Sequence, residues 1–282
     1  MKTRTRTALG LAAAAVSIAG CSAVLGLETD RHVVAAEIID AGVDSGLPYA
    51  WRCENDPVPD AAPGPLHLKM FVNDVSTASS QNSFAGNPIP GASVNACSTL
   101  DIACATPVGT ATSDDAGIAL MQVPSGFSGY YELRATGFTS AIAAHTPQLG
   151  DEYVQEGMAN VALIAAGGGL AGVTLDPNPM GTAIVSVLDC DQAPAVGMQV
   201  EVGAPGATET LVYLANSLPS ASATETDTTG SAIIYNVPAG TLRLTASFAA
   251  DHKPLRAMST IARVGWVTFV QMRLDQSYRV PL

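Results

Sequence analysis

The chain has 282 residues, of which 13 are Lys or Arg and 25 are Asp or Glu, so its formal net charge is −12 at pH 7. This acidity argues against binding to nucleic acid, because contacts with phosphates need basic patches. Charged residues make up only 13% of the chain, while small and β-branched residues are frequent. Such a composition is typical of exported β-sandwich proteins and not of helical bundles.

The first 20 residues predict a secretory signal peptide, because a basic start precedes an apolar run that is too short to span a bilayer. The run ends in Ile-Ala-Gly directly before Cys21, and this ending resembles the bacterial lipobox. The resemblance implies cleavage before Cys21 and three fatty chains on that residue, which would fasten the protein to a membrane. Ser22 favours the outer membrane, because an Asp at this position would resemble the signal that retains lipoproteins of enteric bacteria in the inner membrane. The alternative is an ordinary cleavage site next to a structural cysteine.

Residues 21–50 are acidic and rich in Ala and Gly, and we expect a disordered tether there. Folded structure is expected to begin at Trp51, and the prolines that follow exclude a helix. The predicted units are a signal peptide (1–20), the tether (21–50), a first β-sandwich (51–165), a linker able to form a short helix (166–180) and a second β-sandwich (181–282).

Four cysteines follow Cys21, and an even number in an exported protein predicts two disulfides. Three connectivities are possible among Cys53, Cys97, Cys104 and Cys190. Cys97 and Cys104 enclose only six residues and can close a small loop. We therefore favour this pair, which leaves Cys53 to bond with Cys190. A zinc site is not expected, because zinc prefers closer CxxC pairs with histidine partners.

An internal repeat is the strongest sign of organisation after the signal peptide. Each copy contains a strand that begins G-x-x-V, a turn with Asp and a final Gly, a short strand, the motif V-P-x-G and another strand. In such a turn the Asp side chain accepts hydrogen bonds from backbone amides ahead of it, and Gly adopts a positive φ. The turn residues are Asp114, Asp115 and Gly117 in the first copy and Asp227 and Gly230 in the second.

Alternating apolar residues and turn signals predict the strands. We expect them over residues 66–75, 118–123, 130–135, 160–164, 184–188, 198–202, 210–214, 231–237, 242–246 and 264–273.

The order of motifs, read twice, resembles the carboxypeptidase regulatory-like, or transthyretin-like, β-sandwich over about residues 66–164 and 181–275. The resemblance implies an all-β fold of two tandem Ig-like or transthyretin-like antiparallel β-sandwiches. It also implies non-catalytic modules that pack against other domains or bind surfaces. The arrangement of a lipobox, an acidic tether and two modules along the chain resembles that of lipoproteins of myxobacteria-like genomes.

The sequence suggests no catalytic set, because the four histidines are scattered and the glycines around Ser128 lack the spacing of a nucleophile elbow. Asp189 and Asp191 could contact calcium, but that ion needs six to eight oxygens, and solvated acids at a strand end are the simpler interpretation. We expect no enzyme activity, no cofactor and no metal. A hydrolase that uses Ser128 is the least favoured alternative.

We therefore expect a non-catalytic lipoprotein whose two modules make structural or adhesive contacts with a protein or a glycan of the cell envelope. A glycan-binding lipoprotein is the alternative, because exposed aromatic side chains can stack on sugars. The candidate sugar platform consists of Tyr130, Tyr131, Tyr213 and Trp266.

Overall fold

The computed structural model of the protein describes residues 51, 53, 60–77, 86–144, 147–176, 180–203, 209–216 and 218–273. The expected signal peptide, Cys21 and the tether lie outside these residues. Among the described residues, no helix has the length and apolarity needed to cross a membrane.

The described residues form sixteen strands, which fall into two successive groups in the chain. The first group is β1 (Leu66–Asp74), β2 (Asn87–Pro88), β3 (Ser93–Ser98), β4 (Gly109–Thr112), β5 (Ile118–Val123), β6 (Gly129–Arg134), β7 (Ala141–Ala144) and β8 (Glu152–Met158). The second group is β9 (Gly181–Leu188), β10 (Met198–Gly203), β11 (Thr210–Ala215), β12 (Leu218–Ser220), β13 (Ser231–Val237), β14 (Gly240–Phe248), β15 (Pro254–Ala262) and β16 (Val267–Arg273). A 3-10 turn (Val75–Thr77) and the helix α1 (Val161–Leu170) complete the described elements.

Each group of strands builds a sandwich around its own apolar core, so the expected all-β sandwich fold is confirmed. In the first sandwich, β1 pairs with β2, β5 and β8, and this sheet faces the strands β4-β3-β6-β7. In the second sandwich, the sheet β10-β14-β15 faces the strands β12-β11-β13-β9-β16. Strands with every second side chain buried, such as β1 and β5, supply the inner faces of these layers.

The repeat in the sequence corresponds to a repeat in strand pairing. In the first copy, β1 pairs antiparallel with β5 and parallel with β8. In the second copy, β9 pairs antiparallel with β13 and parallel with β16. The expected antiparallel pairing does not hold for β1 with β8 or for β9 with β16, because the last strand of each copy returns alongside its first strand in the same direction.

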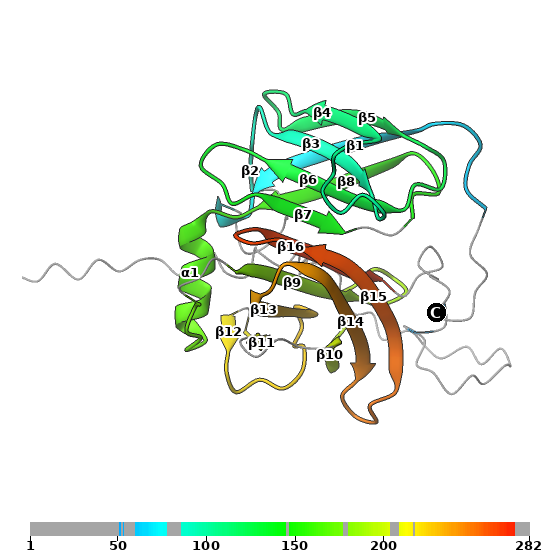
Figure 1. Cartoon of the computed structure of the whole chain (residues 1–282). Helices are drawn as coiled ribbons and strands as arrows, with labels where there is room; N and C mark the ends of the chain where they lie inside the picture. Colours follow the sequence, from blue (N-terminus) through cyan, green and yellow to red (C-terminus); the bar gives the residue numbers. More distant parts are fainter. Residues whose placement is uncertain are drawn as a thin grey trace, which may run out of the picture.

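The two sandwiches share one hydrogen-bonded sheet. Strand β16 of the second copy pairs parallel with β7 of the first, from Val267 opposite Ala141 to Val270 opposite Ala144. The result is a continuous nine-stranded sheet in the order β12-β11-β13-β9-β16-β7-β6-β3-β4, and Figure 1 shows β16 lying directly along β7. Ala144 even packs into the core of the second sandwich. The backbone sheet therefore continues across the boundary that the sequence suggests.

Residues 160–164, expected as a strand, instead begin the helix α1. The side chain of Asn160 caps this helix by accepting a hydrogen bond from the backbone N–H of Leu163 at 2.8 Å. The buried Gly167 allows the helix to approach β13 closely, since a Cβ at that position would lie 2.7 Å from the Tyr235 hydroxyl. The strand prediction fails because the cap and this close approach outweigh the β-propensity of Val161 and Ile164.

The described cysteines form two disulfides, as expected, and they join Cys53 to Cys190 and Cys97 to Cys104. The first disulfide ties the segment before β1 to the end of β9 in the second sandwich. Trp51 is buried there, and its ring meets that of Phe248 edge-on at 4.9 Å. The expectation that residues from Trp51 onward belong to the first sandwich is therefore wrong for this segment, because Trp51 completes the second core.

Replacing Cys53 and Cys190 together by alanine is expected to lower the free energy of unfolding more than the matched replacement of Cys97 and Cys104. The sequence separations are 137 and 7 residues, and the entropy of loop closure assigns about 5 and about 2.5 kcal/mol to loops of these lengths. Urea unfolding of both double variants under the same oxidising conditions measures the difference. Equal losses in the two variants would contradict this expectation.

Candidate functional site

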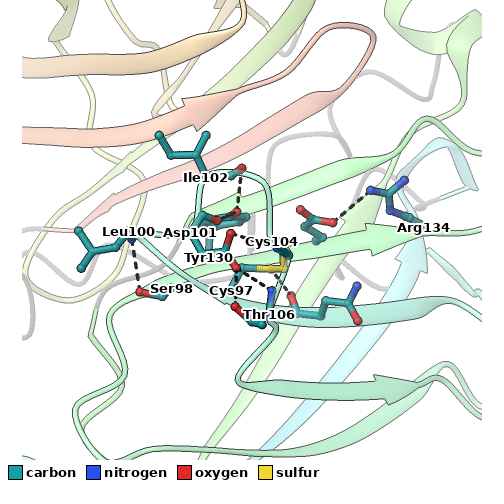
Figure 2. Close-up of a disulfide and its surroundings, with 12 residues drawn as sticks. Cys97, Ser98, Leu100, Asp101, Ile102, Cys104, Thr106, Tyr130 and Arg134 are labelled. Atoms are coloured by element: carbon teal, nitrogen blue, oxygen red, sulfur yellow. Dashed lines mark hydrogen bonds and ion pairs between the residues drawn. A yellow bond between two sulfur atoms is a disulfide. The ribbon is translucent and has the colours of Figure 1, made fainter.

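The loop closed by Cys97 and Cys104 presents apolar side chains to solvent. It follows β3 directly, and the disulfide joins its two ends (Figure 2). Leu100 at its tip is 94% exposed, and Ile102 is 56% exposed. Isolated exposed leucines are common on proteins, so the conformation of the loop decides whether this tip is a defined surface.

Asp101 fixes the conformation of this loop. Its carboxylate accepts hydrogen bonds from the backbone N–H groups of Ala105 at 3.0 Å and Thr106 at 2.8 Å. The bonds from Thr106 and Ala105 stabilise the charged form and hold the pKa of Asp101 below its ordinary value. Asp101 therefore acts as an internal brace, and its negative charge is directed at the backbone of its own loop.

Two side chains outside the loop hold its backbone in place. The Tyr130 hydroxyl donates a hydrogen bond to the carbonyl of Asp101 at 2.6 Å. The Arg263 guanidinium donates to the carbonyl of Ile102 at 2.6 Å and to the Tyr130 hydroxyl at 3.1 Å. Because Arg263 follows β15, an arginine of the second copy positions a loop of the first. Burial raises the pKa of Tyr130, which keeps its hydroxyl protonated as a donor.

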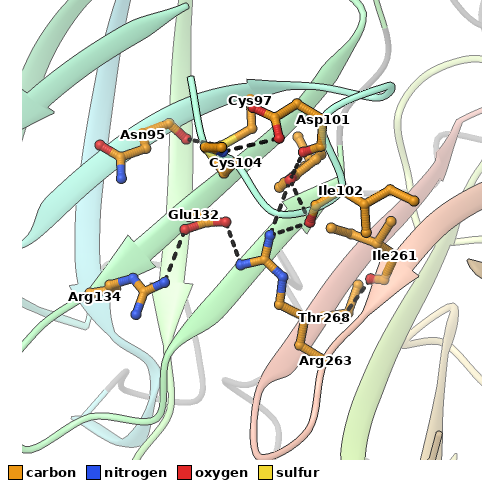
Figure 3. Close-up of polar contacts among 12 residues, drawn as sticks. Asn95, Cys97, Asp101, Ile102, Cys104, Glu132, Arg134, Ile261, Arg263 and Thr268 are labelled. Carbon is orange, nitrogen blue, oxygen red and sulfur yellow. Dashed lines mark hydrogen bonds and ion pairs between the residues drawn. A yellow bond between two sulfur atoms is a disulfide. The ribbon is translucent and has the colours of Figure 1, made fainter. Parts of the chain in front are cut away.

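A buried ion-pair network lies beside the loop, at the junction of the two sandwiches (Figure 3). The side chain of Glu132 on β6 is only 3% exposed and forms a close ion pair with Arg263. Arg134 contacts the other carboxylate oxygen at 3.2 Å, and its own side chain is 54% exposed. A buried carboxylate requires such partners, because burial without them is strongly unfavourable. Arg263 therefore links the junction of the sandwiches to the exposed loop.

Trp266 contacts both arginines of this network. The guanidinium carbons of Arg134 and Arg263 are 4.4 and 4.8 Å from its ring centroid, and both contacts have cation–π geometry. The ring is half-buried and helps to order both arginines. The ring is therefore engaged with two arginines within the protein, and Trp266 is not the open stacking surface that the sugar platform required.

The three tyrosines of the expected sugar platform are buried, so that prediction is wrong. Tyr130, Tyr131 and Tyr213 are 2%, 0% and 6% exposed. Tyr131 packs against Phe127 in the first core. The Tyr213 hydroxyl accepts a hydrogen bond from the backbone N–H of Val200 at 2.8 Å. A chain with 5% aromatic residues uses these rings to fill its cores and its junction.

The turn residues of the repeat act locally. Asp114 accepts hydrogen bonds from the backbone N–H groups of Ala116 and Ile118, each at 2.9 Å, and Asp115 is exposed. Asp227 accepts one from the backbone N–H of Thr229 at 2.8 Å. Gly117 and Gly230 have φ values of +73° and +64°, which close the two turns.

One buried hydroxyl in each copy was missed by the sequence analysis. Ser113 donates to the carbonyl of Ile89 at 2.6 Å and accepts from the backbone N–H of Ala92 at 2.8 Å. Thr226 repeats this pattern with Ala195 at 2.6 Å and Met198 at 2.9 Å. Each hydroxyl belongs to the residue directly before the turn Asp. Its recurrence at that position in both copies could have indicated a shared structural role from the sequence alone.

The described residues offer little for metal or nucleophilic chemistry. Cys97, Cys104 and Glu132 place ligand atoms within 4.8 Å of one another, but the disulfide removes the thiolates that a metal would need. Asp189 accepts hydrogen bonds from the backbone of Asp191 and Ala193, each at 2.9 Å, and so forms a turn. Ser128 is exposed on the segment before β6.

No family model matches the chain, and no curated protein matches it. Among solved structures, it is similar to the Bacillus anthracis TIE protein at 10% identity and a TM-score of 0.24, over 75% of this chain and 34% of that one. A streptococcal ancillary pilin matches at 11% identity and a TM-score of 0.21, over 79% and 64%. The minor pilin GBS52 of Streptococcus agalactiae matches at 13% identity and a TM-score of 0.21, over 77% and 97%.

This chain thus spans about a third of the TIE protein chain and just under two thirds of the ancillary pilin chain. Likenesses at these identities and TM-scores assign no family to the chain. The β-sandwich assignment is based on the strand pairing itself.

Replacing Arg263 by methionine is expected to lower the free energy of unfolding by about 3 kcal/mol, because the buried Glu132 loses its closer cation. Combining Arg263→Met with Glu132→Gln should cost at least about 1 kcal/mol less than the sum of the single changes, since the two groups interact directly. Urea unfolding of the four proteins completes the double-mutant cycle. The exposed Arg243 on β14 provides a matched control, and Arg243→Met should change stability by less than about 0.5 kcal/mol. Strict additivity would refute the proposed coupling.

Proposed function

We propose that the chain is an exported, non-catalytic lipoprotein of a bacterial envelope, anchored through Cys21 in the outer membrane. Its two joined sandwiches present the tip of the 97–104 loop for adhesive or structural contact with another envelope protein. The observation that carries this proposal is the 94% exposure of Leu100 on a loop whose backbone is fixed by other side chains.

A fixed apolar tip is suited to binding. Burying a leucine or isoleucine side chain in a partner contributes about 1.5–3 kcal/mol. The loop is closed by a disulfide, braced by Asp101 and held by Tyr130 and Arg263. It therefore loses little further conformational entropy when a partner binds, which preserves most of the contact energy.

Export and a non-catalytic role are supported by separate observations. The two disulfides fit an oxidising compartment, and the sequence before Cys21 has the form of a lipoprotein signal peptide. Around the loop, the ionisable side chains have structural partners: Glu132 pairs with two arginines and Asp101 with backbone amides. Such groups order a contact surface and are not arranged around a substrate.

In cells that produce the full chain, Cys21→Ser is expected to abolish incorporation of labelled palmitate, because the lipid is attached to that thiol. Cys53→Ser serves as the control and should keep the label, since Cys53 belongs to a disulfide. Immunoprecipitation and detection of the label measure the result. Retention of palmitate in the Cys21→Ser chain would exclude the proposed anchor.

A photoreactive residue at position 100 of the full chain is expected to form a discrete protein adduct in intact envelopes. The same residue at Val196, which is 58% exposed and distant in sequence, is the control and should not. Adding Ile102→Asp should reduce the adduct about tenfold, because a charge would then enter the apolar contact. Electrophoresis and mass spectrometry identify the adduct. Equal labelling from positions 100 and 196 would count against the loop tip as the contact surface.

A further inference from the structure

A second surface lies on the outer face of the other sheet of the first sandwich. Strand β1 runs between β5 and β8 there, with His67 opposite Gln122 and with Lys69 opposite both Leu120 and Tyr153. All of these side chains are exposed, while the alternate residues of β1 are buried. Asp151 directly precedes β8 and completes the row that begins at Gln122. The face therefore carries two rows of side chains across three strands.

The first row is an ordered set of hydrogen-bonding groups. The Gln122 amide nitrogen is 2.9 Å from the Nε2 atom of His67. The Asp151 carboxylate accepts a hydrogen bond from the His67 backbone N–H at 2.7 Å and lies 3.7 Å from its Nδ1 atom. The side chains of His67 and Asp151 nevertheless remain 65% and 68% exposed. An amide, an imidazole and a carboxylate are thus held side by side while they remain accessible to a ligand.

The second row is amphipathic. Tyr153 is 55% exposed and Leu120 is 69% exposed. The Lys69 ammonium lies over the Tyr153 ring, 5.8 Å from its centroid, and Tyr153 keeps its 55% exposure with this contact in place. An exposed ring beside polar groups suits the two chemistries of a sugar, since its CH face can stack on the ring while its hydroxyls reach the first row.

The charge of this surface favours an uncharged ligand. The positive charge of Lys69 and the negative charge of Asp151 offset each other, while the whole chain carries a net charge of −12. An acidic polymer that approached the face would be repelled by the protein as a whole. A neutral, hydroxyl-rich ligand would meet no such repulsion and would match the mixture of donors and acceptors.

We propose that this face binds a neutral glycan. Tyr153 stacks on a sugar ring, and Gln122, His67 and Asp151 hydrogen-bond its hydroxyls. The site goes beyond the contact proposed for the 97–104 loop, because it lies on the outer face of the sheet that packs opposite the one containing β3. It also does not depend on the lipid anchor, so either proposal can fail alone.

The purified full chain, kept in detergent, should bind members of an array of neutral hexose and N-acetylhexosamine oligosaccharides and should not bind polygalacturonate. Calorimetry with the best neutral oligosaccharide should then show at least tenfold weaker binding by Tyr153→Ala and at least threefold weaker binding by Gln122→Ala. Tyr153→Phe should bind within threefold of the original protein, because it keeps the stacking ring.

Leu100→Ala is the matched control, since it removes an exposed side chain from the other surface and should leave glycan binding unchanged. Thermal unfolding establishes that each variant is folded. Absence of binding to every neutral oligosaccharide, preference for polygalacturonate, or unchanged affinity in Tyr153→Ala would overturn the site. None of these results affects palmitate labelling at Cys21 or cross-linking from position 100, which test the anchor and the loop separately.

Discussion

The structure depends on neutralising one buried carboxylate. Glu132 lies at the junction of the two sandwiches with 3% of its side chain exposed, and a charge at such a site needs a close and well-oriented cation. Arg263 comes from the second copy and also binds the 97–104 loop through the carbonyl of Ile102. The position of one arginine therefore sets the relation between the sandwiches, the stacking of Trp266 and the orientation of the exposed tip.

The strand pairing at the same junction explains why the duplicated modules form one body. An unpaired edge strand exposes backbone groups that can pair with other chains. Here the backbone groups of β7 and β16 pair with each other over the four residue pairs from Ala141–Val267 to Ala144–Val270. Ile142 and Ile261 pack beside this pairing with the disulfide of the loop. Backbone hydrogen bonds, apolar contacts and the ion pair therefore coincide in one place.

Local features of the fold could be predicted from the sequence, because short-range chemistry determines them. Apolar runs and turn signals located β1, β5 and β13, and the even number of cysteines after Cys21 predicted the disulfides. The pairing of β7 with β16 could not be predicted, since Ala141–Ala144 carries no side chain that specifies a distant partner. The burial of both Tyr130 and Tyr131 was missed for a related reason. Tyr131 packs in the core of the first sandwich, whereas Tyr130 packs at the junction, and the junction exists only once the two copies are assembled.

The disulfide between Cys53 and Cys190 has a mechanical consequence. It attaches the segment at Cys53 covalently to the second sandwich, whereas Leu100 and the strands β1, β5 and β8 belong to the first. Tension between the N-terminus and a ligand bound at the surfaces proposed on the first sandwich would be shared between β1 and the paired strands β7 and β16. The hydrogen bonds between β7 and β16 and the contacts of Arg263 with Glu132 and Ile102 then bear the load together, so the molecule can resist pulling as a single unit.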